Sequence, residues 1–109
     1  MKLLLDACVP RPLRKFLPEH DVRTAQEMGW GQLKNGALLR EAEIQFEVFI
    51  TTDQNLKYQQ QAVGRKLAIL VLPTNDWPTI RSKAVKISAK VATLKPGDFV
   101  ELSWFQLLN

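Results

Sequence analysis

Two aspartates in this sequence each end a short apolar run. Asp6 ends the run "KLLLD" and Asp53 ends "VFITTD", so each carboxylate follows a segment with the composition of a buried strand. The carboxyl ends of parallel strands meet at one edge of a sheet, where such sheets bind ligands. Carboxylates that converge there suit Mg²⁺ or Mn²⁺, which can activate water and polarise a phosphodiester. We therefore identify Asp6 and Asp53 as candidate catalytic residues and metal ligands.

Two further acids map to the same edge. Asp76 follows the apolar run 66–72 by a few residues, and Glu41 lies in a helix expected to begin near this edge. Both are additional candidate metal ligands, but each also has a structural interpretation. Asp76 stands where a helix N-cap is expected, and Glu41 fits the solvated face of its helix. Asp53, in "TDQN", also fits an Asx-turn or an N-cap.

The elements that must position these acids alternate along the chain. Pro10 and Pro12 open an amphipathic helix that Pro18 ends, because proline is tolerated only in the first turn of a helix. A second helix is expected from an N-cap at Asn35 to about Gln45. The segments with strand composition are residues 2–5, 20–24, 47–52, 66–72 and 99–104.

Two more helices complete the alternation. A short one is expected after Asp53, reaching about Val63 and ended by Gly64. A longer one follows "PTNDWP" and has an apolar stripe at helical spacing. The stripe consists of Ile80, Ala84, Ile87, Val91 and Leu94. Strands that alternate with helices predict the α/β class, here a three-layer α/β/α domain with a mainly parallel five-stranded sheet and right-handed crossovers. At 109 residues, the chain is expected to form a single domain, residues 1–109.

Composition excludes several kinds of protein. The chain has one cysteine and one histidine, so an intrachain disulfide is excluded and the usual zinc ligands are too few. No segment approaches the roughly 20 apolar residues that span a bilayer. The first apolar run is too short for the core of a signal peptide. We therefore expect a cytoplasmic protein with no membrane partner. Cys8, near a strand end, is a candidate nucleophile, but a small buried thiol is the expected role.

Basic side chains gather on two of the expected helices. The chain has a net charge of +4 and a pI of about 9.5, which is compatible with a nucleic-acid partner. One stripe on the last helix has the spacing i, i+3 and i+7, and a second cluster lies on the first helix. Solvated lysines beside a core-facing stripe are the alternative interpretation. The candidate nucleic-acid-binding residues are Arg11, Arg14, Lys83, Lys86 and Lys90.

Three segments together resemble one known family. "MKLLLDACVPRPLRKFL", "HDVRTAQEMGWGQLKNGALL" and "EVFITTDQNLKYQQ" are similar to the small bacterial PIN-like domain proteins, relatives of the VapC toxins and Mut7-C nucleases. The resemblance implies a Rossmann-like α/β/α domain and a Mg²⁺- or Mn²⁺-dependent ribonuclease, in many members the toxin of a toxin–antitoxin pair. It implies RNA, a cognate antitoxin-like protein and a second copy of the chain as partners. Asp6 matches the first acid of the family, and Asp53 matches the acid that closes the third strand.

The chain departs from the family pattern at three positions. It has Ala7 and Ala37 where relatives often have an acid, and Asn55 where some have a further aspartate. Two hypotheses follow. The first is a metal-dependent ribonuclease with an incomplete acidic cluster. The alternative is a catalytically degenerate PIN-like protein that binds a protein or RNA, with Trp30 either on the partner surface or in the core.

Overall fold

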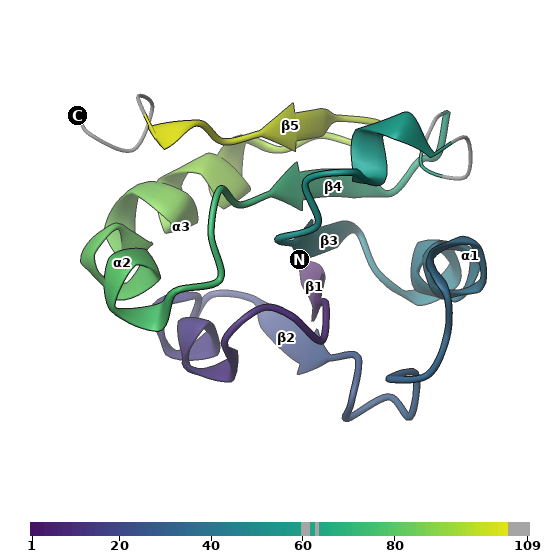
Figure 1. Cartoon of the computed structure of the whole chain (residues 1–109), viewed down its shortest axis with the longest axis horizontal. Helices are drawn as coiled ribbons and strands as arrows, with labels where there is room; N and C mark the ends of the chain where they lie inside the picture. Colours follow the sequence, from purple (N-terminus) through teal and green to yellow (C-terminus); the bar gives the residue numbers. More distant parts are fainter. Residues whose placement is uncertain (60–61, 63, 105–109) are drawn as a thin grey trace.

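Five parallel strands form one sheet in the computed structural model, which describes residues 1–59, 62 and 64–104 (Figure 1). The spatial order of the strands is β2-β1-β3-β4-β5, and every neighbouring pair is parallel. The α/β class and the parallel five-stranded sheet are therefore confirmed. The strands are β1 (Lys2–Leu5), β2 (Asp21–Thr24), β3 (Val48–Thr51), β4 (Ala68–Val71) and β5 (Phe99–Glu101).

The three central strands are buried on both faces. Every residue of β3 and β4 is buried, and so are Leu3, Leu4 and Leu5 of β1. Continuous apolar runs are what a parallel sheet covered on both faces requires. The edge strand β2 instead alternates between exposed and buried residues. The buried-strand composition of the runs before Asp6 and Asp53 is therefore confirmed for β1 and β3.

Helices cover both faces of the sheet and complete two core layers (Figure 1). One face packs against η1 (Arg11–Phe16), α2 (Trp77–Ser82) and α3 (Ala84–Thr93). The other face packs against α1 (Asn35–Gln45) and η2 (Leu56–Tyr58). Among the described residues, no helix is both long and apolar enough to cross a membrane.

The strand order places a topological switch point between β1 and β3. The chain runs from β1 outward to β2 and then returns to β3 on the other side of β1. In doubly wound sheets with the order 2-1-3-4-5, ligands bind outside the carboxyl ends of β1 and β3. Asp6 follows β1 directly, and Asp53 lies two residues beyond β3. Both candidate acids therefore lie at the position where this fold class binds ligands.

The expectation that every crossover is right-handed is wrong for one connection. The β1–β2 connection through η1 and the β4–β5 connection through α2 and α3 cover the same face, although they lead in opposite directions along the sheet. Parallel connections that cross one face in opposite directions have opposite hands. The short η1 leaves much of this face open, and the apolar stripe of α2 and α3 fills it. That stripe is buried as predicted.

Three predicted helices differ in form. The segment after Pro10 is a 3-10 helix because prolines remove two N–H donors at its start and Pro18 disfavours α geometry at Leu17. The segment after Asp53 is also a 3-10 helix, Leu56–Tyr58; residues 60, 61 and 63 of its predicted extent lie outside the described residues.

The last predicted helix is interrupted at one residue. Lys83 separates α2 from α3, so the apolar stripe continues across two helices instead of one. At the residue before Lys83, the Ser82 hydroxyl donates to the carbonyl of Thr79, one turn earlier in α2 (2.7 Å). Such a bond competes with the helix ladder and bends helices.

Candidate metal site at the carboxyl edge of the sheet

Asp6 is held beside β3 by an extension of the strand pairing. Its backbone N–H donates to the Ile50 carbonyl (2.9 Å), one residue beyond the β1–β3 ladder. This register brings the Asp6 carboxylate next to Thr51. The Thr51 hydroxyl donates to Asp6 Oδ2 (2.7 Å), and the Ala7 N–H donates to Asp6 Oδ1 (2.8 Å). Both oxygens of this half-buried carboxylate therefore have a fixed direction.

Asp53 is oriented by a turn and by the first residue of α1. Its Oδ1 accepts from the Asn55 N–H (2.9 Å), which is the predicted Asx-turn. Its Oδ2 accepts from the Asn35 side-chain amide (3.2 Å), and that amide also donates to Gln59 Oε1 (3.2 Å). The predicted N-cap role of Asn35 is wrong. Lys34 occupies the N-cap position, and the Asn35 side chain reaches the acid instead.

Thr51 joins the two acids. Its hydroxyl donates to Asp6 and accepts from the backbone N–H of Asp53 (3.1 Å). The residue is fully buried at the end of β3, so its hydroxyl has no competing water. Sequence analysis missed both Thr51 and Asn35. Threonine in a strand is explained by its β-propensity, and asparagine before a helix is explained by capping, so neither pattern signals a site.

The charge of the two acids has no counterpart among the described side chains. Neither carboxylate pairs with a lysine or arginine there, and every donor bound to them is a neutral amide, hydroxyl or thiol. These neutral donors orient the two half-buried carboxylates but do not neutralise their charge. Oxygen ligands of this kind fit Mg²⁺ or Mn²⁺, which commonly bind one or two carboxylates and complete their shell with water.

The additional candidate ligands do not join the pair. Asp76 is the N-cap of α2: its Oδ2 accepts from the Thr79 N–H (3.2 Å) and from the Thr79 hydroxyl (2.5 Å). Glu41 lies half-buried on α1. In the described part of the chain, no three His, Cys, Asp or Glu side chains gather closely enough to hold a metal ion. The site is thus built on two acids.

Cys8 is exposed, so the expectation of a buried thiol is wrong. The residue lies on the loop between β1 and η1, where the chain has left the sheet. Its thiol donates to Asp6 Oδ2 at 3.6 Å and contacts the Thr51 hydroxyl at 3.7 Å. The thiol therefore lies at the surface of the acid pair rather than in the core.

The predicted nucleic-acid-binding residues lie in one layer of the fold, the layer that contains η1, α2 and α3. Residues 11–16 and 77–93 include seven Lys or Arg and no Asp or Glu, and the other eight basic residues share the rest of the chain with all 11 acids. A hollow of about 260 Å³ is lined by Arg11, Pro12, Arg14 and Lys15. Arg14 also pairs with Glu27. The seven residues of this basic layer are Arg11, Arg14, Lys15, Arg81, Lys83, Lys86 and Lys90.

Glu27 ties the glycine-rich loop to the edge of the sheet. Its Oε1 accepts from the Thr24 N–H (2.9 Å), and both of its carboxylate oxygens accept from Nη1 of Arg14 (2.8 and 3.0 Å). The Thr24 hydrogen bond, followed by that from Arg14, holds the pKa of Glu27 below its ordinary value. In the same loop, Trp30 is half-buried and packs edge-on against Phe46, with ring centroids 6.1 Å apart. Trp30 thus has a core role.

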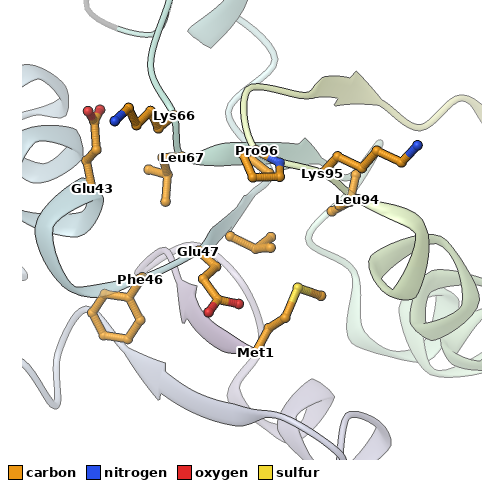
Figure 2. A pocket seen from close by; sticks show the side chains of 11 residues that line it. Met1, Glu43, Phe46, Glu47, Lys66, Leu67, Leu94, Lys95 and Pro96 are labelled. Carbon is orange, nitrogen blue, oxygen red and sulfur yellow. The ribbon is translucent and has the colours of Figure 1, made fainter.

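A separate hollow of about 250 Å³ lies at the opposite, amino-terminal edge of the sheet (Figure 2). Phe46, Leu67 and Leu94 line it with apolar groups, and charged side chains such as Glu47 stand beside them. Its residues precede or begin strands of the sheet, whereas the acid pair follows β1 and β3. This hollow is therefore separate from the candidate metal site.

Comparison of the chain with protein-family models, curated proteins and solved structures finds no match.

Proposed function

We propose that this chain is a metal-dependent phosphodiester hydrolase that acts on RNA, with Asp6 and Asp53 as ligands of Mg²⁺ or Mn²⁺. The observation that supports it is the pair of half-buried carboxylates at the β1/β3 switch point, linked through Thr51 and lacking a basic partner among the described residues. A divalent ion, when bound, supplies an activated water and stabilises charge on the phosphate. The chain's own contribution is to orient the two carboxylates.

Substrate binding is assigned to the basic layer in this proposal. Both η1 and α2 begin just beyond the carboxyl ends of strands, so the basic layer starts at the same edge as the acids. Lysine and arginine side chains that neutralise phosphates give an affinity that falls as salt rises. The resemblance to PIN-like proteins supports RNA as the polyanion, a toxin role opposed by an antitoxin-like protein, and a cytoplasmic location.

The test is cleavage of a mixed-sequence RNA with Mn²⁺ or Mg²⁺, and with a chelator in place of the metal. Asp6→Asn and Asp53→Asn keep the side-chain shape but remove ligand charge, so each is expected to abolish metal-dependent cleavage. Asp76→Asn is the matched control, because Asp76 caps α2 outside the pair and Asn is also a good N-cap. Cleavage that persists in Asp6→Asn would refute the assignment.

A binding module without catalysis is the second candidate function. Ala7 and Ala37 stand where relatives often have acids, so the site has two carboxylates rather than a larger cluster. This function predicts salt-dependent RNA binding by fluorescence anisotropy, with no cleavage under any metal condition. Lys86→Glu on the basic layer should then weaken binding, whereas Asp6→Asn should leave it unchanged.

A further inference from the structure

The sheet has two edge strands, β2 and β5. Most outward backbone groups of β2 are hydrogen-bonded, whereas those of β5 have no partner among the described residues. In a parallel sheet, alternate residues of an edge strand direct both N–H and C=O toward the neighbouring strand, and the residues between them direct both groups outward. Outward groups without partners are a template for pairing with another chain.

The β2 edge is closed by side chains. The backbone N–H groups of Asp21 and Ala25 donate to the carbonyls of Met1 and Leu5. By the alternation of the ladder, Val22 and Thr24 direct their backbone groups outward. Three of these four groups are bonded. Arg14 donates to the Val22 carbonyl (3.3 Å), Glu27 accepts from the Thr24 N–H (2.9 Å), and the Met28 N–H donates to the Thr24 carbonyl (3.1 Å). The Arg14–Glu27 ion pair therefore covers this edge.

The β5 edge is open. Ile69 donates to the Asp98 carbonyl, and Leu102 donates to the Val71 carbonyl. Phe99 and Glu101 therefore direct their N–H and C=O groups outward, and no described residue bonds to these groups. Val100, between them, directs its backbone N–H and C=O toward β4. The outward residues are thus symmetric about Val100.

Exposed aromatic side chains flank this open edge. The exposed fractions are 36% for Phe99, 76% for Tyr58 and 49% for Trp104. Lys57 links η2 to the edge, with its ammonium 3.5 Å from Glu101 and 5.2 Å from the Tyr58 ring centroid. Because α2 and α3 cover the other face, η2 is the one helix among the described residues that lies on this face beside β5 (Figure 1). The exposed surface at this edge therefore extends beyond β5 onto η2.

We propose that the β5 edge pairs with β5 of a second copy of this chain in antiparallel orientation, with a two-fold axis at Val100. This register forms four backbone hydrogen bonds and sets Phe99 opposite Glu101 of the partner subunit. Lys57 of the partner subunit, which contacts that glutamate, then lies near the Phe99 ring, a favourable cation–π arrangement. The edge is therefore self-complementary in backbone groups, charge and apolar surface. The proposal is independent of catalysis at the acid pair.

A three-residue edge buries little area, so the dimer is expected to form reversibly with increasing concentration. Sedimentation equilibrium should show a mass that rises from 12.4 kDa toward twice that value. Glu101→Pro removes an outward N–H but none of the β4–β5 bonds, and should stay at the monomer mass. Glu101→Ala keeps that N–H and is the matched control, which should still dimerise.

Amide hydrogen exchange on the unaltered chain provides a second measurement. The Phe99 and Glu101 amides should exchange about tenfold more slowly at high than at low protein concentration, because pairing protects them. The Thr24 amide, bonded to Glu27, should exchange equally slowly at both. A chain that stays monomeric with rapidly exchanging Phe99 and Glu101 amides would overturn the proposal. So would a Glu101→Pro variant that dimerises like the unaltered chain, or protection that requires a different protein.

Discussion

Thr51→Val tests whether the buried hydroxyl organises the acid pair. Valine has nearly the same shape as threonine, so the change creates no cavity and removes only the hydroxyl. The lost hydrogen bond to the Asp6 carboxylate is worth about 1.5–3 kcal/mol, as for hydrogen bonds to charged groups. The Asp53 N–H also loses its acceptor, which adds about 1 kcal/mol because water reaches this half-buried residue only in part.

Together these losses predict that the free energy of unfolding falls by about 2.5–4 kcal/mol. Urea denaturation measures this change directly, and the melting temperature should fall by about 4 °C per kcal/mol. Thr52→Val is the matched control, since no described residue forms a hydrogen bond with its hydroxyl, and it should change stability by less than about 0.5 kcal/mol. If Thr51→Val and Thr52→Val are equally stable, the bridge between the acids contributes nothing and the reasoning fails.

Two other predictions follow from the surroundings of the site. Because the pKa of Glu27 is lowered, its contribution to stability is present above its ordinary value of 4.5 and is lost as pH falls through the lowered value. Urea denaturation across pH should therefore show Glu27→Gln less stable than the unaltered chain near neutrality and equal to it in strong acid; a constant difference would contradict this. Cys8 should react with a chromogenic disulfide reagent without denaturant, and Mn²⁺ should slow the reaction; a thiol that reacts only after unfolding would show that it is buried.

The strands and the position of the acids were predictable because local sequence patterns specify them. A continuous apolar run such as that in residues 66–72 is typical of a strand buried on both faces, and alternation with helices implies parallel pairing. Parallel pairing then places the ends of β1 and β3 at one edge, so Asp6 and Asp53 had to lie there. The N-cap role of Asp76 followed from its place before Trp77-Pro78.

The groups that orient the acids were not predictable in this way. Thr51 acts through the register between β1 and β3, and Asn35 acts through the position of α1 over the sheet. Both depend on tertiary geometry, whereas their local patterns fit ordinary strand and capping roles. The exposure of Cys8 has the same cause, because burial after β1 depends on where the chain turns into η1. The opposite hands of the β1–β2 and β4–β5 connections likewise depend on how little of one face η1 covers.

Calorimetric titration of the chain with Mn²⁺ tests the claim that Asp6 and Asp53 form a divalent-metal site. One ion should bind per chain. Asp6→Asn should weaken that binding at least about tenfold, a loss of about 1.4 kcal/mol or more. Asp76→Asn should bind Mn²⁺ as the unaltered chain does. Absence of binding to the unaltered chain, or equal binding by Asp6→Asn, would contradict the claim.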